Sequence, residues 1–389
     1  MYTVQTLNNI SAAGLERLPR ERFTTGADLA DPDAILLRSA DLHKATFGPS
    51  LKAIGRAGAG VNNIPVAAMT ERGIPVFNAP GANANAVKEL VIAGLILASR
   101  HIVPAVEFAR RAGDAADSDA DLHKAVEAGK KAFAGTELPG RTLAVIGLGA
   151  IGGRVANAAV ALGMQVVGYD PGLTLDAAWQ LSPAVVRARS LDEALRTADF
   201  VTLHVPLGPA TRQLIDADRL KAMKPRSAVL NFAREGIVDE PAMLASLDAG
   251  HTLAYISDFP TALTVKHPKC VTTPHLGAST AEAEDNCAIM VADQVRDFLE
   301  HGHVRNAVNF PDLVAPRQTA HRCVCACSAS EQAAANVTNA FAEAGVTVVG
   351  WASATRGVTY VVADVTAPVP AAALERLKAI DGLLMLRQI

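Results

Sequence analysis

One stretch of the chain, TLAVIGLGAIGGRVANAAVALGMQVVGYDP (142–171), constrains the fold more than any other. An apolar strand pattern runs into a G-x-G-x-x-G spacing formed by Gly147, Gly149 and Gly152, and a helical pattern follows. The first glycine permits a tight turn, the second lets the backbone approach a pyrophosphate, and the third lets the helix pack on the strand. The first amide groups of that helix then face the anion. The order of elements therefore predicts a dinucleotide-binding βαβ unit, and a glycine-rich turn without a ligand is the weaker interpretation.

The second strand pattern of this unit ends in Asp170, at the distance from the glycines that such sites require. Its carboxylate can accept hydrogen bonds from both hydroxyl groups of an adenosine ribose and would repel a 2′-phosphate. Pro171 and Gly172 follow and offer no positive charge that could hold such a phosphate. We therefore expect NAD as the cofactor rather than NADP.

Similar apolar runs alternate with Ala-rich helical patterns over roughly the first 300 residues. Near-continuous apolar strands separated by helices predict parallel sheets covered on both faces, and hence an α/β fold. The main strand patterns lie at 34–39, 51–58, 142–147, 165–170, 200–206 and 227–233.

Two long helical patterns, at 84–102 and 279–302, interrupt this alternation, and 113–139 reads as an exposed helix and linker. Beyond a proline-containing break the pattern changes, and we place a boundary near residue 318. The last residues predict a small βαββαβ module of ferredoxin-like type. Its strands are expected at 322–328, 346–352, 358–365 and 383–389, and its helices at 330–344 and 370–379.

Composition narrows the classes of function. A net charge of −3 argues against a binder of nucleic acid or of an anionic membrane. The longest apolar run, Leu90–Ala98, is too short to span a bilayer, and the N-terminus has no secretory pattern. Five cysteines are too few for a disulfide scaffold, so a cytoplasmic protein is expected. Cys323, Cys325 and Cys327 alternate along one strand face and are interpreted as small buried hydrophobes, and no metal site is expected.

Several motifs outside the glycine loop carry a resemblance that covers about residues 35–311. They are LLRSA (36–40), GRAGAGVNNIPV (55–66), NAPGANANAVKELV (78–91), LHVPLGPATRQLI (203–215), NFAREGIVDE (231–240), SDFP (257–260) and TPHLGAST (273–280). Together they resemble the D-2-hydroxyacid dehydrogenase family, and within it the branch that acts on 3-phosphoglycerate. The C-terminal module resembles the ACT domains that accompany this branch.

The resemblance implies an architecture of two Rossmann-like, doubly wound parallel-sheet lobes and an ACT-like module. A substrate-binding domain would comprise 1–84 and 278–317, an NAD-binding domain 85–277, and a regulatory or oligomerisation domain 318–389. The site would lie at the carboxyl ends of strands. The resemblance also implies a homo-oligomer, a dimer or a tetramer.

The resemblance further implies roles for individual residues. Arg234 would bind the substrate carboxylate and polarise the C2 oxygen, and His275 would act as the acid and base. Cofactor contacts would come from Gly147, Gly149, Ala150, Ile151, Gly152, Asp170, His204, Phe232, Ala233, Arg234, Asp258, His275 and Gly277. Arg38, Ser39, Asn62 and Lys88 would bind the substrate, although Lys88 is also interpretable as a snorkelling surface lysine.

One position departs from the family pattern. The family places a glutamate behind the catalytic histidine, and the matching residue here is Ala262, between Thr261 and Leu263. Either His275 works without a carboxylate partner, or the chain binds NAD and turns over poorly. We expect an active enzyme whose activity persists to lower pH than in relatives with the glutamate.

The leading expectation is therefore NAD-dependent oxidation of 3-phospho-D-glycerate to 3-phosphohydroxypyruvate, the first step of L-serine synthesis. A hydroxypyruvate or 2-ketoacid reductase, which would not depend on a phosphate, is the first alternative. An NAD-binding regulatory homologue with weak activity is the second.

Overall fold

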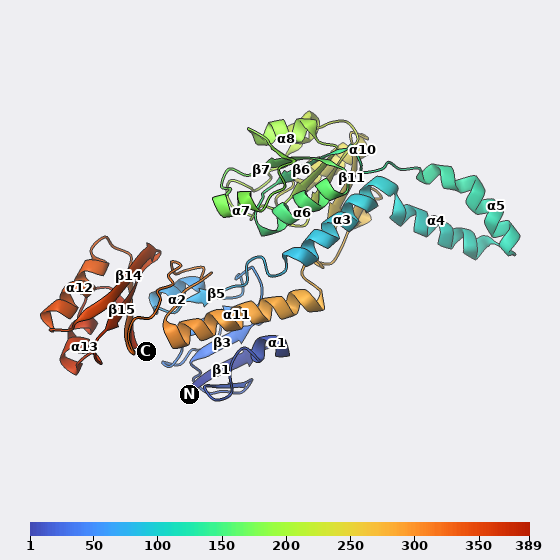
Figure 1. Ribbon diagram of the computed structural model, residues 1–389. Helices are drawn as coiled ribbons and strands as arrows, with labels where there is room; N and C mark the ends of the chain where they lie inside the picture. Colours follow the sequence, from blue (N-terminus) through green and yellow to red (C-terminus); the bar gives the residue numbers. More distant parts are fainter. The chain divides into compact units, whose positions relative to one another are not determined.

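The computed structural model describes all residues from Met1 to Ile389, and these form two compact units (Figure 1). One unit combines Met1–Asn83 with Ala281–Ile389, and the other is Ala84–Thr280. The C-terminal module thus belongs to the same unit as the N-terminal lobe. The finer division into substrate-binding, NAD-binding and regulatory domains stays a prediction.

The unit Ala84–Thr280 is built on a seven-stranded parallel sheet with the order β12-β11-β10-β9-β6-β7-β8. The order reverses between β6 and β9, the kind of switch point at which α/β sheets bind ligands beyond the strand ends. The strands are β6 (Thr142–Ile146), β7 (Gln165–Tyr169), β8 (Val185–Arg187), β9 (Phe200–Leu203), β10 (Ser227–Asn231), β11 (Thr252–Ser257) and β12 (Cys270–Thr272).

Helices cover both faces of this sheet because successive strand residues point to opposite sides. Leu143 and Val145 of β6 pack with α3 (Ala84–Arg100) and α6 (Ala150–Ala161). Ala144 and Ile146 pack into a second core formed with α8 (Leu191–Thr197), α9 (Ala217–Ala222) and α10 (Glu240–Asp248). The expectation of a doubly wound α/β sheet is confirmed for this unit. The short α7 (Leu175–Trp179) and the 3₁₀ turn η2 (Thr264–Lys266) complete it.

Two helices between α3 and β6 form an arm that projects from the sheet (Figure 1). His101 adopts a left-handed conformation with φ of 50° and starts α4 (Ile102–Ala115), which is followed by α5 (Asp119–Gly129) and η1 (Lys130–Phe133). None of these elements has a buried residue. The expected exposed helix and linker are therefore two helices and a 3₁₀ turn. No single helix is long and apolar enough to cross a membrane, although α3 and α4 pass that test together across a 63° bend.

The N-terminal part of the other unit is a five-stranded parallel sheet with the order β2-β1-β3-β4-β5. Its strands are β1 (Tyr2–Leu7), β2 (Phe23–Gly26), β3 (Ala34–Leu37), β4 (Ala53–Arg56) and β5 (Val76–Phe77), with α1 (Ala12–Leu15) and α2 (Val66–Glu71) between them. The long α11 (Ala281–His301) packs tightly on β4, because a Cβ on Gly55 would lie 2.6 Å from Val291 Cγ2.

The C-terminal module is a four-stranded antiparallel sheet with the order β14-β15-β13-β16. The predicted βαββαβ sequence is confirmed as β13 (His321–Ser328), α12 (Ala333–Glu343), β14 (Val348–Arg356), β15 (Val358–Val365), α13 (Ala371–Lys378) and β16 (Leu383–Gln388). Cys323, Cys325 and Cys327 are buried against the helices, as expected of small apolar side chains. A hydrogen bond to Cys323, together with burial, raises the pKa of the Cys325 thiol, and burial raises the pKa of the Cys327 thiol.

The opposite face of the module packs against the N-terminal lobe of the same unit. Val324 and Tyr360 share one core with Phe298 of α11. Side chains of the module also bond to carbonyl groups at the C-terminal end of α11, where such groups have no partner within the helix. Arg322 Nη1 donates to His301 O at 2.8 Å, and the Tyr360 hydroxyl donates to Gly302 O at 2.7 Å.

Candidate functional site

The glycine loop leaves room for a ligand on one side only. Gly147 has φ of 90°, and a Cβ there would lie 2.5 Å from His204 O. A Cβ on Gly152 would lie 1.9 Å from Gly147 O, so the helix packs directly on the turn. A Cβ on Gly149 would meet no atom within 4 Å. The open space at Gly149, before Ala150 and Ile151 at the start of α6, fits the approach of a pyrophosphate.

Asp170 is fixed beside this loop at the end of β7. Its Oδ2 accepts from the backbone N–H of Leu148 at 2.8 Å, and its Oδ1 accepts from that of Gly172 at 2.9 Å. Each carboxylate oxygen can accept more than one hydrogen bond, so both can still bind ribose hydroxyl groups.

His204 follows β9 and holds an unpaired buried nitrogen. Its Nε2 lies 2.9 Å from Thr202 Oγ1, whereas its Nδ1 is buried without a partner. Burial lowers the pKa of His204 to about 3, so the imidazole is neutral near pH 7. An orphaned polar atom at a strand end is an observation that fits a missing ligand. Together with the open Gly149 and the fixed Asp170, it shows that the residues present fit a dinucleotide.

Arg234 lies in the loop after β10 and is exposed. Its Nη1 donates to Ala233 O at 2.6 Å, and no acidic side chain forms an ion pair with it. Asn231, which the sequence reasoning missed, shapes this loop: Nδ2 donates to Arg234 O at 2.9 Å and Oδ1 accepts from Ala233 N at 3.1 Å. Phe232 turns inward, its ring 3.1 Å from where a Cβ on Gly94 would lie, so its predicted cofactor contact would be made by the backbone.

Asp258 organises the loop that carries His275. Its carboxylate accepts from Thr273 Oγ1 at 2.6 Å, from Leu276 N at 2.7 Å and from Gly277 N at 2.8 Å. The N–H of His275 donates to Asp258 O at 3.0 Å, and His275 has the left-handed φ of 55°. Since Asp258 is 1% exposed, the structure gives it the role of an anchor for this loop, and its predicted contact with the nicotinamide stays a prediction.

No carboxylate forms an ion pair with His275, whose ring instead lies 5.0 Å from that of Phe259. The segment around Ala262 does meet one acid. The Thr261 hydroxyl donates to Glu240 Oε2 at 2.7 Å, one residue before the position at which the family carries its glutamate. Burial, followed by the charge of Glu240, raises the pKa of Cys270 to about 12. Glu240 could not be recognised from the sequence, because its contact joins the first residue of α10 to the loop after β11.

The predicted cofactor and catalytic residues of this unit therefore follow β6, β7, β9, β10, β11 and β12. Since all these strands are parallel, their carboxyl ends lie along one edge of the sheet. Arg234 and His275 follow β10 and β12, which flank β11 with Asp258 at its end. The edge thus holds a guanidinium, an imidazole and a dinucleotide-type loop.

The predicted substrate residues lie in both units. Arg38 follows β3, and its Nη1 lies 2.7 Å from Glu284 Oε1. The N–H of Ser39 donates to Asn8 Oδ1 at 3.1 Å, and Asn62 is exposed. Lys88 belongs to α3, is 23% exposed and lies 3.6 Å from Glu89 Oε1, a loose pair that leaves its two interpretations open.

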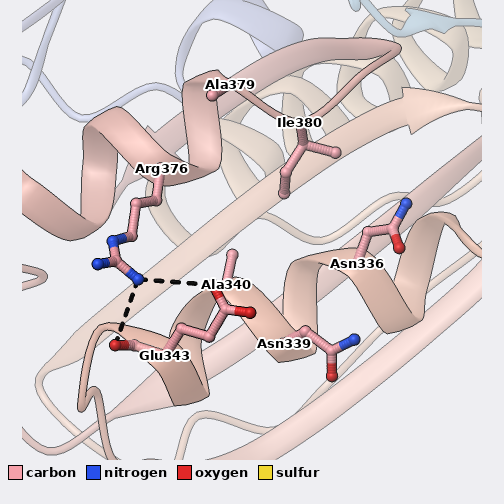
Figure 2. A pocket seen from close by; sticks show the side chains of 7 residues that line it. All are labelled: Asn336, Asn339, Ala340, Glu343, Arg376, Ala379 and Ile380. Carbon is pink, nitrogen blue, oxygen red and sulfur yellow. Dashed lines mark hydrogen bonds and ion pairs between the residues drawn. The ribbon is translucent and has the colours of Figure 1, made fainter.

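A cavity of about 420 Å³ lies elsewhere, between α12 and α13 of the C-terminal module (Figure 2). Figure 2 shows Arg376 directed at Glu343, whose Oε2 lies 3.5 Å from the guanidinium. The other lining residues are Asn336, Asn339, Ala340, Ala379 and Ile380. None of the predicted catalytic or cofactor residues lines it, and no group of His, Cys, Asp or Glu in the structure is arranged to hold a metal ion.

Comparison with known proteins agrees with this geometry. Residues 104–277 match the family model described as D-isomer specific 2-hydroxyacid dehydrogenase, NAD binding domain. A D-3-phosphoglycerate dehydrogenase from Synechocystis is 40% identical over 295 residues, covering 72% of this chain and 49% of the relative. One from Bacillus subtilis is 36% identical over 334 residues, covering 80% of this chain and 60% of the relative. The chain thus spans about half of the length of the curated relatives it matches.

A solved structure extends the likeness to the fold. The NAD⁺-bound 3-phosphoglycerate dehydrogenase of Entamoeba histolytica is 25% identical, with a TM-score of 0.60, and the match covers 80% of this chain and 99% of that one.

Proposed function

We propose that this protein, whose residues 104–277 are an NAD-binding domain of the D-isomer specific 2-hydroxyacid dehydrogenase family, oxidises 3-phospho-D-glycerate to 3-phosphohydroxypyruvate. Relatives named D-3-phosphoglycerate dehydrogenase support the substrate, since they match over most of this chain. The reaction would be the entry step of L-serine synthesis.

One observation carries the proposal: Arg234 has no acidic partner, and it follows a strand at the same sheet edge as His275 and the dinucleotide loop. Bound NAD supplies the hydride acceptor. The guanidinium of Arg234 binds the substrate carboxylate and polarises the C2 oxygen. The imidazole of His275 takes the proton of the C2 hydroxyl group as the hydride leaves. Arg38 and Ser39 bind the phosphate.

We infer a homo-oligomer from the arm formed by α4 and α5. It has no buried residue, and Ile102, Val103 and Val106 expose 37–43% of their surface. An apolar row on a projecting helix is typical of a surface that another copy covers. A dimer or tetramer is therefore part of the proposal. We also propose, from the sequence, that the protein is cytoplasmic and that its C-terminal module is an ACT-like domain.

The test is NADH formation from 3-phosphoglycerate at alkaline pH, with D-glycerate as the unphosphorylated comparison. A kcat/KM at least tenfold higher for the phosphorylated acid is expected. Equal values would instead indicate the hydroxypyruvate or 2-ketoacid reductase.

The second candidate, an NAD-binding regulatory homologue, is favoured by the absence of an ion pair on His275. It would bind NAD and give no NADH with any 2-hydroxy acid. The Arg234→Gln variant separates the two candidates. In an enzyme, loss of the guanidinium group lowers kcat/KM about 30-fold or more, whereas in a protein without turnover the variant leaves NAD binding and the absence of NADH formation unchanged.

A further inference from the structure

We propose that Glu284 is a specificity-determining residue, a carboxylate of this chain that competes with the substrate phosphate for Arg38. The inference rests on the proposed function, which assigns the phosphate to Arg38. It concerns binding rather than hydride transfer, so it can be tested without turnover.

The contact between the two side chains is short, and the backbone that carries each of them is held in place. Arg38 directly follows β3, and Glu284 lies in the first turn of α11, with Nη1 and Oε1 2.7 Å apart. The carbonyl of Arg38 accepts from Arg56 Nε at 3.1 Å and from Asn63 Nδ2 at 3.3 Å, which sets the position of its loop. An acid in the first turn of a helix is itself favoured by the helix dipole. The unliganded protein therefore presents Arg38 already engaged by an anion.

Further charges gather at the same place. Burial raises the pKa of Cys287, one turn along α11; Arg38 and Arg56 act to lower it and Glu284 to raise it. The charges of Arg38, Arg56 and Glu284 thus all act on this thiol, and Glu284 offsets part of the positive charge of the two guanidinium groups.

A phosphate on Arg38 would place its charges beside that of Glu284. The phosphorylated ligand must displace the Glu284 carboxylate from Arg38 or share the guanidinium with it. An unphosphorylated hydroxy acid has no group that competes with Glu284. Glu284 therefore weakens the binding of phosphorylated substrate and product, and speeds their release.

The Glu284→Gln variant removes the charge and retains the shape. Because exposed ion pairs contribute little, we expect KM for 3-phosphoglycerate to fall about two- to fivefold, with KM for D-glycerate and for NAD unchanged. Glu282→Gln is the matched control, since Glu282 lies in the same turn, is exposed and forms no ion pair. In an Arg38→Ala background the effect of Glu284→Gln should disappear.

Inorganic phosphate provides a probe that needs no catalysis. Its dissociation constant, from calorimetry or ³¹P line broadening at low ionic strength, should fall by the same factor in Glu284→Gln and not in Glu282→Gln. An unchanged or weaker affinity would overturn the inference and give Glu284 the role of orienting Arg38. Absence of NADH formation in every variant would reject the proposed function alone, because the phosphate titration still tests Glu284.

Discussion

At the scale of single residues, the buried carboxylate of Asp258 fixes the loop that carries His275, the proposed acid and base, without contacting its imidazole. It accepts three hydrogen bonds from Thr273, Leu276 and Gly277, on either side of His275. A histidine at φ of 55° is strained and keeps that conformation only where its surroundings impose it. Asp258 is therefore a positioning residue for His275.

The Asp258→Asn variant should lower kcat about 10- to 100-fold, because an amide nitrogen would face a backbone N–H and displace the loop. Thr273→Val removes one of the three hydrogen bonds and should lower kcat less, by about five- to tenfold. KM for NAD should be unchanged in both variants, as measured from initial rates. A rise in that KM for Asp258→Asn alone would instead show that Asp258 contacts the cofactor.

Ala262, at the position where the family pattern has a glutamate, gives a second prediction at this scale. Ala262→Glu would introduce a negative charge at the position where the family carries its glutamate, and a nearby negative charge favours the protonated imidazole. The acidic limb of the kcat/KM profile should move to higher pH by up to about one unit. Thr261→Glu, one residue away, serves as the control. A profile that Ala262→Glu leaves in place would contradict a carboxylate role at this position.

Which of these residues could be read from the sequence depends on how local their signal is. Gly147, Gly149, Gly152 and Asp170 are recognisable because their conformations and spacing follow from one βαβ unit. Asn231 and Glu240 left no such mark. Glu240 meets the Thr261 hydroxyl, 21 residues away in the chain, only once α10 and the loop after β11 lie together. Asn231 contacts Arg234 O only three residues on, but through a loop conformation that the residue types alone do not specify.

At the scale of elements, the glycine loop and the first turn of α6 contain one glycine that packing requires and one that we expect ligand binding to require. The missing Cβ of Gly152 is required for packing, because its place is 1.9 Å from a backbone oxygen. A Cβ on Gly149 would contact no protein atom, so packing does not require a glycine there. We therefore expect opposite effects from alanine at the two positions.

Gly152→Ala should destabilise its unit by about 1–3 kcal/mol, because the backbone must shift to admit a methyl group. Gly149→Ala should change stability by less than about 1 kcal/mol, since Gly149 has an ordinary negative φ at the N-cap. It should nevertheless weaken NAD binding at least tenfold, because the methyl group would occupy the side from which a pyrophosphate approaches. Thermal unfolding and calorimetric titration with NAD measure the two effects. Unimpaired NAD binding by Gly149→Ala would reject this placement of the pyrophosphate.

The elements themselves were predictable where they are long or strongly apolar. The pattern at 84–102 became α3, which ends at Arg100 because His101 turns left-handed and begins α4. The pattern at 279–302 became α11, which ends before Gly302 with φ of 69°. Residue patterns could not separate α3 from α4, since a non-glycine residue at positive φ leaves no local signal.

At the scale of the whole molecule, the predicted boundary near residue 318 is a change of architecture rather than of packing. Strand β13 alternates cysteines facing the helices with Val324 and Ala326 facing the core of the N-terminal lobe. A strand that is apolar at successive positions predicts burial on both faces. That signal was present in RCVCACS, although the element occupying the second face could be identified only from the structure.

The buried pair of Arg322 and Asp364 lies within the C-terminal module, and its arginine links the module to α11. Arg322 Nε lies 2.7 Å from Asp364 Oδ1, their side chains are 0% and 3% exposed, and Arg322 also bonds to the end of α11. Burial alone would raise the pKa of Asp364. The hydrogen bonds from Arg322 and from the backbone N–H of Gln318, with the charges of Arg322 and Arg317, together outweigh burial and hold the pKa below its usual value. Because the folded protein binds this proton less readily than the unfolded chain, the stability from the pair is present at neutral pH. It is lost as pH falls through the pKa of the folded state.

Arg322→Met should therefore lower the free energy of unfolding of this unit by about 3–5 kcal/mol, because it leaves Asp364 buried without its partner. The double variant with Asp364→Leu should recover much of that loss, since two apolar side chains need no partner. Denaturant unfolding followed at Trp351, which lies on β14 of the same module, measures both. In the single variant the N-terminal lobe should unfold together with the module, because Tyr360 and Phe298 share one core. A separate transition of the module, with the lobe unaffected, would mean that the shared core does not couple them.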